Sequence, residues 1–203
     1  MSAQTLMSDG VATLLGDPGS FAAGSWLRGG ERAIEAINPS TEDVMATLPR
    51  ASVAEVDQAV RAAREAFDRG PWPRMAPRER ALLMNRLVER LDAHRDELTE
   101  IGLREVGSPL LLSRVLHAGA PITFFEYWAE MAVKGPNGRW SEGLPIHDNP
   151  VLSASMLIKE PIGVVASIIA YNFPLLIISF KIGAALASGC TSVIMPSPRA
   201  ATA

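Results

Sequence analysis

The chain has 203 residues, of which 48% are hydrophobic and 20% charged, so it has enough apolar side chains for a buried core and no signature of disorder. Its formal net charge of −3, from 22 acidic and 19 basic residues without a basic stripe, argues against a nucleic-acid partner. The single cysteine excludes an internal disulfide and a cysteine-based zinc site, and it is typical of a reducing compartment such as the cytoplasm.

Residues 1–20 show little hydrophobic periodicity and are predicted to form a loose arm. They lack the basic start and long apolar core of a secretory signal. The three histidines, His94, His117 and His147, lie far apart without metal-ligand spacing. We therefore expect no metal site and assign each histidine to the surface or to a helix end.

Apolar residues flank a polar turn at residues 38–43, which predicts two short strands between residues 25 and 50. Ser52 and Glu55 have the spacing of a capping box, in which the serine caps a helix and the glutamate reaches back. Behind them, apolar residues at helical spacing predict a helix over residues 53–67.

The next helix is predicted to begin near Pro77, because proline suits the first helical turn. Its buried stripe is predicted to consist of Leu82, Leu83, Leu87, Val88 and Leu91. A further helix is predicted over residues 96–104.

Helical periodicity continues over residues 110–133, where Gly119 and Pro121 predict a bend or a break. The aromatic residues between positions 124 and 128 are interpreted as core packing rather than as a cofactor box. A strand of mixed polarity is predicted over residues 153–158.

The apolar run from residue 161 to 196 carries the clearest pattern. Residues 163–169 are rich in β-branched side chains and predict a buried strand. A turn at Asn172-Phe173-Pro174 leads into a helix over residues 175–188, and a second strand follows over residues 190–195. This order predicts one βαβ unit.

A membrane-spanning helix is an alternative for residues 161–180, because this stretch carries no charge and is long enough to cross a bilayer. Asn172 and Pro174 would break its backbone hydrogen bonding where lipid cannot replace it. A βαβ unit accounts for the same residues with fewer penalties. Membrane association is therefore the third interpretation of the chain, behind two soluble ones.

Several short motifs follow one another in a specific order along most of the chain. They are Ile37-Asn38-Pro39-Ser40-Thr41, Gly70-Pro71-Trp72, Glu105-Val106-Gly107-Ser108-Pro109, Glu160-Pro161-Ile162-Gly163-Val164-Val165, Asn172-Phe173-Pro174-Leu175, Lys181 and Ala185-Leu186-Ala187-Ser188-Gly189. In this order and spacing they resemble the N-terminal part of the aldehyde dehydrogenase superfamily.

The resemblance implies an α/β fold with an incomplete Rossmann-like parallel sheet. It assigns residues 21–138 to the N-terminal strands and helices of the cofactor-binding domain, residues 139–158 to a protruding oligomerisation hairpin, and residues 159–203 to the first βαβ unit of that domain, which is incomplete. It also implies oxidation of an aldehyde to a carboxylic acid with NAD or NADP, by a homo-oligomer or by a chain that pairs with homologues.

By the same resemblance, Asn172 stabilises the substrate oxygen as it becomes negative, with an amide N–H as the donor. A simple helix N-cap is the alternative role for Asn172. Lys181 is assigned structural support, because a lone charge in an apolar run must reach water or a partner. The residues implied to contact the cofactor are Ile169, Ala170, Tyr171, Asn172, Met195, Ser197 and Pro198.

The chain departs from the family pattern at Met195, where the family usually has a lysine that hydrogen-bonds the adenosine ribose. A family acid that often reads the ribose 2′-hydroxyl would lie near Pro198, which leaves the choice between NAD and NADP open. The nucleophilic cysteine and the general-base glutamate of the family belong downstream of Ala203, and Cys190 is interpreted as a small buried hydrophobe. We therefore expect the isolated chain to be inactive. The alternative is a non-catalytic pseudoenzyme or interaction module that pairs with full-length homologues.

Overall fold

The computed structural model describes residues 19–30, 33–135, 139–148 and 150–202, so residues 1–18 of the predicted arm lie outside the described part. The elements, in chain order, are β1 (Ser20–Ala22), β2 (Ser25–Leu27), β3 (Ala33–Ile37), β4 (Val44–Pro49), α2 (Val53–Asp68), the 3₁₀ turn η2 (Trp72–Arg74), α3 (Pro77–Ala93), α4 (Arg95–Glu105), α5 (Leu110–Leu112), the π-helical segment η3 (Ser113–Gly119), α6 (Ala120–Lys134), β5 (Ser141–Gly143), β6 (Met156–Ile158), β7 (Val164–Ile168), α7 (Pro174–Ala187) and β8 (Thr191–Met195).

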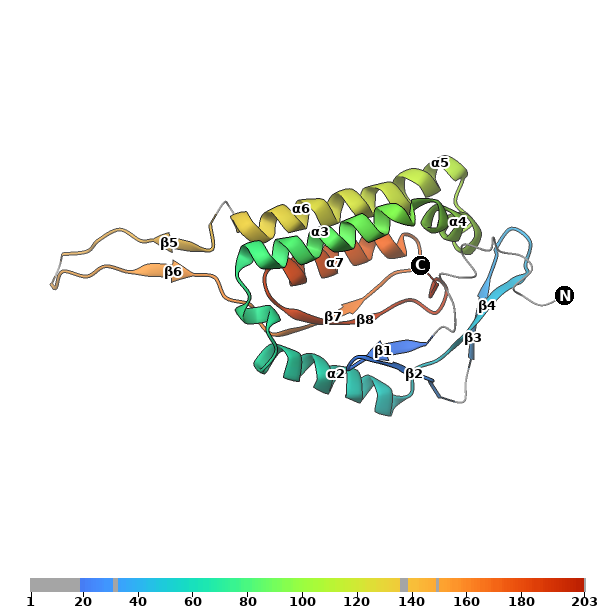
Figure 1. The fold of residues 1–203 in the computed structure, drawn as a ribbon, viewed down its shortest axis with the longest axis horizontal. Coiled ribbons are helices and arrows are strands. Elements are labelled where there is room, and N and C mark those ends of the chain that lie inside the picture. The colour runs from blue at the N-terminus through green and yellow to red at the C-terminus, as the bar shows by residue number, and fades with distance from the viewer. Residues whose placement is uncertain (1–18, 31–32, 136–138, 149, 203) are drawn as a thin grey trace.

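The strands β7 and β8 form the parallel pair that the apolar run predicted. Their register runs from Val164 opposite Thr191 to Ile168 opposite Met195, and α7 connects them. In Figure 1, α3, α6 and α7 form a helical layer on one side of this pair, and α2 lies on the other side. The βαβ prediction is therefore confirmed.

The two strands are less buried than their composition predicted. Ile168 is 62% exposed and Met195 is 54% exposed, and Ile194 is exposed as well. These residues lie at the carboxyl ends of the strands. The prediction of a buried strand over residues 163–169 therefore holds only in part, because the described helices leave this end of the parallel pair uncovered.

The helical layer packs around two clusters of buried side chains. The first joins Ala81 and Met84 of α3 to small residues of α6 and α7, and the second joins Val88 of α3 to Ile122 and Phe125 of α6. Residues 81, 84 and 88 share one helical face. Two further residues, Leu87 and Leu91, pack against the second cluster.

The predicted stripe of α3 was partly wrong, because Leu82 is 63% exposed and Leu83 is also exposed. The face that is buried is centred on Ala81 and Met84, whose neighbours across the interface are alanines. A small residue at the contact lets two helices approach closely, and hydrophobicity alone does not reveal that preference.

The break predicted within residues 110–133 is present as a change of helix type. The segment η3 is π-helical, and the amide of Ala120 donates to the carbonyl of Val115 across five residues. The aromatic prediction holds for the buried Phe125 and for Phe124, whose ring centroid lies 4.4 Å from that of Phe180. It was wrong for Tyr127, which is half exposed.

Three antiparallel hairpins accompany the parallel pair. The pair β3–β4 is the predicted one, whereas β1–β2 begins at Ser20 and was missed. The pair β5–β6 projects away from the rest of the molecule, and all six of its strand residues are exposed (Figure 1). The predicted strand over residues 153–158 is thus shorter and more exposed than expected.

The capping box at the start of α2 is confirmed. The Glu55 carboxylate accepts from the backbone N–H of Ser52 at 2.8 Å, and the Glu55 N–H donates to the Ser52 hydroxyl at 3.3 Å. The backbone N–H groups of Ser52 and Gly29 lower the pKa of Glu55, because they stabilise its charged form. The Glu55 carboxylate therefore links Gly29, which follows β2, to the start of α2.

Within the described ranges, no helix has the length and apolarity that a membrane crossing requires. The uncharged stretch 161–180 is divided between β7 and the first half of α7, a helix of 14 residues.

Candidate functional site

The turn between β7 and α7 presents three exposed residues at the carboxyl end of the parallel pair. Ile169 is buried, and its N–H donates to the Met195 carbonyl at 3.0 Å, which closes the pair. Ala170, Tyr171 and Asn172 follow and are exposed. The chain then enters α7 through Phe173, and Pro174 takes the first helical position.

The alternative role of Asn172 as a helix cap was wrong. The N-cap residue of α7 is Phe173, with φ −145° and ψ 68°, and no side chain caps the helix. Proline at the first helical position removes one of the backbone donors that a cap would otherwise satisfy. The side chain of Asn172 is thus left at the surface of the turn.

Lys181 lies on α7 and reaches across to the turn. Its Nζ donates to the carbonyl of Ile168, the last residue of β7, at 2.6 Å. This carbonyl lies at the open end of the parallel pair, and the bond ties α7 to the strand that leads into the Asn172 turn. The contact fits the supporting role expected for Lys181.

The loop after β8 lies beside the turn after β7. The ring of Tyr171 lies 5.4 Å below the guanidinium of Arg199, which joins the two loops. The Ser197 hydroxyl accepts from the Arg199 N–H at 3.2 Å, and the Ser197 carbonyl accepts from the Ala200 N–H at 3.0 Å. The residues predicted to contact a cofactor are thus gathered at one edge, because parallel strands end on the same side of a sheet.

Two positive side chains lie at this edge, and the Glu105 carboxylate of α4 accepts from the Thr202 N–H at 2.8 Å just beyond them. Residues 161–203 contain no Asp or Glu, and Lys181 and Arg199 are their charged side chains. Sequence reasoning did not select Arg199, although its place just beyond a strand end was a usable signal. A basic residue and exposed backbone at the carboxyl ends of parallel strands suit an anionic ligand such as a phosphate group.

The surface position considered for His117 was wrong, although the residue does lie in the last turn of a helical segment. It lies in η3 and is 2% exposed. Its Nε2 lies 2.9 Å from the Ser108 hydroxyl, and its ring centroid lies 5.1 Å from that of Phe173. Burial lowers the pKa of His117, because it disfavours the charged imidazolium.

The one cysteine of the chain is not placed for nucleophilic chemistry. Cys190 is 2% exposed, and its sulfur accepts from the Ser188 hydroxyl at 3.4 Å. A nucleophilic thiol needs access to substrate and an electropositive or basic neighbour. The interpretation of Cys190 as a small buried hydrophobe is confirmed.

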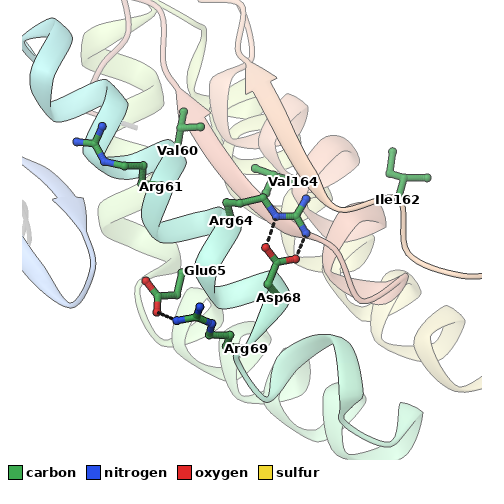
Figure 2. Close-up of a pocket in the computed structure, with 8 residues that line it drawn as sticks. All are labelled: Val60, Arg61, Arg64, Glu65, Asp68, Arg69, Ile162 and Val164. Atoms are coloured by element: carbon green, nitrogen blue, oxygen red, sulfur yellow. Dashed lines mark hydrogen bonds and ion pairs between the residues drawn. The ribbon is translucent and has the colours of Figure 1, made fainter.

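A separate open hollow of 580 Å³ lies between α2 and the approach to β7. Figure 2 shows an apolar part formed by Val60, Ile162 and Val164, with charged side chains of α2 around it. Ion pairs join Arg64 to Asp68 and Arg69 to Glu65. These pairs neutralise two of the three arginines that line the hollow, and Arg61 leaves the hollow with one net positive charge.

The sequence profile of the aldehyde dehydrogenase family matches residues 26–203. The chain belongs to this family. It is 36% identical over 169 residues to a human cytosolic 10-formyltetrahydrofolate dehydrogenase, an alignment that covers 83% of this chain and 18% of that protein.

Solved structures of the family superimpose well on this chain. An NAD-dependent aldehyde dehydrogenase from Sinorhizobium meliloti matches with a TM-score of 0.78 and 34% identity, over 89% of this chain and 35% of that one. A betaine aldehyde dehydrogenase from Staphylococcus aureus, solved with NAD⁺, matches with a TM-score of 0.84 and 28% identity, over 95% of this chain and 37% of that one. The chain thus spans between 18% and 37% of the length of these three proteins.

Proposed function

We propose that this chain supplies the oxyanion turn and part of the cofactor-binding edge of an NAD- or NADP-dependent aldehyde dehydrogenase. The observation that carries the proposal is the exposed Asn172, presented beside a positively charged strand edge in a chain of this family. The substrate class is an aldehyde, and the product is a carboxylic acid. A reducing cytoplasm is the proposed location, in keeping with a single buried thiol.

Asn172 would donate an N–H to the aldehyde oxygen as negative charge develops on it. Such donors act when they are fixed before the reaction and water is excluded around them. Lys181 supports the turn through its bond to the Ile168 carbonyl. When bound, the nicotinamide cofactor would accept hydride from the substrate carbon.

The carboxyl edge of β7 and β8 would hold the nucleotide part of the cofactor, as the first βαβ unit of a Rossmann-like sheet. The edge offers Arg199 and Lys181 as positive charges, with the exposed backbone of residues 170–172. An anionic pyrophosphate or phosphate suits this arrangement. Ser197, Pro198 and the apolar Met195 would line the side of the nucleotide that rests on β8.

We propose that the chain does not turn over aldehyde by itself, because its one thiol is buried in Cys190. The assay mixes the purified chain with a short aldehyde and NAD⁺ or NADP⁺ and follows formation of the reduced cofactor. We expect none above the rate without protein. Aldehyde-dependent reduction by this chain would refute its proposed dependence on another nucleophile.

The role of Asn172 is tested in a chimera in which residues 26–203 replace the matching part of the Sinorhizobium meliloti enzyme. We expect the chimera to oxidise aldehyde, and Asn172→Ala to lower its kcat about a hundredfold, as removal of one oxyanion donor does elsewhere. The matched control is Asn38→Ala, which changes an asparagine in the exposed turn before β4, far from the β7–α7 turn in sequence. An unchanged kcat in Asn172→Ala would refute the oxyanion role.

The projecting β5–β6 hairpin is the proposed contact with a second copy or with a homologue. It exposes apolar side chains at Leu144, Ile146, Val151, Leu152, Met156, Leu157 and Ile158. Monomeric soluble proteins rarely expose so many apolar residues on one element. Light scattering should give a mass above that of the monomer, and Leu157→Lys should reduce it.

An interaction module without catalysis is the second candidate function, and the same exposed hairpin favours it. The discriminating measurement is co-purification of the tagged chain with a full-length homologue. Association in the absence of any activity in the chimera would support the module. Activity of the chimera would favour the enzyme.

A further inference from the structure

His117 is a buried polar residue that the proposed reaction does not use. Its Nε2 is held by Ser108, while its Nδ1 has no hydrogen-bond partner among the described residues. An unpaired buried polar atom costs free energy, so apolar packing alone does not account for a histidine here.

The main chain around His117 is adapted to this side chain. It belongs to the seven-residue π-helical segment η3, a helix type that is rare and often lies at functional sites. The helix α4 approaches the ring through Gly102, where an added Cβ would lie 2.5 Å from the His117 Cβ. The His117 ring thus packs between Gly102 of α4 and Phe173 at the start of α7.

On its other side the ring faces the turn that carries Asn172. The His117 and Phe173 ring centroids are 5.1 Å apart, with 35° between the ring planes. Phe173 is the N-cap of α7, and its carbonyl accepts from the Ile177 N–H at 2.9 Å, the first hydrogen bond of the helix. A fixed Phe173 therefore fixes both the helix start and the residue before it.

The geometry points to His117 as a positioning residue that holds the Asn172 turn through the Phe173 ring, an inference that rests on the oxyanion role proposed for Asn172. The Ser108 hydroxyl orients the imidazole, and the imidazole holds the Phe173 ring in position. The position of Phe173 then determines the direction in which the Asn172 side chain points. His117 itself touches no reacting atom.

The test uses the isotope-labelled chain and NMR. The wild-type chain should give nuclear Overhauser contacts between the His117 and Phe173 rings. His117→Gln keeps a polar group near Ser108 but removes the ring, and it should shift the Asn172 side-chain amide resonance. It should also speed hydrogen exchange of the Ile177 amide roughly fivefold, the loss expected for one aromatic pair. His117→Phe keeps a ring against Phe173 but loses the Ser108 bond, so both readouts should lie closer to the wild type than those of His117→Gln.

His94→Gln is the matched control, because His94 lies exposed at the end of α3 and should leave both readouts unchanged. If His117→Gln accelerates exchange equally throughout α4 and α6, the residue is only structural and the inference is wrong. The inference also fails if the Asn172 side-chain resonance does not shift in His117→Gln. It fails as well if the wild-type chain shows no contact between the His117 and Phe173 rings, and that measurement does not depend on whether a variant folds.

This test is separate from that of the proposed function. An inactive chimera, or an Asn172→Ala chimera with unchanged kcat, would refute the oxyanion role while the NMR coupling between His117 and Asn172 remained. Absent coupling in an active chimera would refute only the positioning role.

Discussion

Gly183 of α7 lies in close contact with Trp128 of α6, and the substitution Gly183→Ala tests that packing. A Cβ added at Gly183 would lie 2.2 Å from Trp128 Cδ1 and 2.8 Å from Trp128 Cγ. These atoms belong to the five-membered ring of the partly buried Trp128 indole, which packs against the cluster around Ala81 and Met84. The ring or the helix must therefore shift.

The magnitude follows from two opposing effects. Overpacking a close contact costs about 1–3 kcal/mol, and a separation this short favours the upper end. Alanine gains about 1 kcal/mol over glycine in a helix interior. The net loss of about 2 kcal/mol corresponds to a melting temperature lower by about 4–8 °C in a chain of this size.

Thermal unfolding followed by far-UV circular dichroism measures the effect. The control is Gly143→Ala in the β5–β6 hairpin, where an added Cβ meets nothing within 4 Å and the melting temperature should stay close to that of the wild type. A Gly183→Ala chain as stable as the wild type, or more stable, would refute the described α6–α7 contact.

Three further changes test other parts of the structure by urea unfolding. Ser52→Ala removes the cap of α2 and should lower the free energy of unfolding by about 1 kcal/mol, and an unchanged midpoint would contradict the cap. Lys181→Met removes the bond to the Ile168 carbonyl and should lower the free energy of unfolding by about 1 kcal/mol. The control Lys134→Met breaks a surface pair with Glu130 that is worth about 0.3–0.5 kcal/mol. Equal losses in the two variants would argue against a special role for Lys181. Burial lowers the pKa of His117 in the folded state, so the unfolded state binds the proton more readily and stability should fall as the pH drops below the ordinary histidine pKa of about 6.5. His117→Phe should flatten that part of the pH profile, and an unchanged profile would contradict the buried neutral imidazole.

Short sequence patterns predicted the elements that are stabilised by contacts between residues close in sequence. The capping box of α2, proline in the first turn of α3 and the strand–turn–helix–strand order of residues 163–195 all depend on short-range chemistry. The hairpin β1–β2 was missed because its strands have three residues each and carry no alternation long enough to detect.

What the sequence could not predict is decided by contacts between distant segments. The buried face of α3 is set by alanines of α6 and α7, so the exposed Leu82 was misassigned. His117 is buried because a glycine of α4 and the ring of Phe173 surround it, and these lie 15 and 56 residues away in sequence. Arg199 joined the candidate site only because β7 and β8 end at the same edge.

Hydrogen–deuterium exchange with and without NAD⁺ or NADP⁺ tests the central claim, that the carboxyl edge of β7 and β8 binds the nucleotide. We predict protection confined to residues 169–172 and 195–199, with none in the β5–β6 hairpin. The α2 hollow around Arg61 and Arg64 is the competing location. Protection at that hollow, or no protection at the strand ends at saturating nucleotide, would contradict the account.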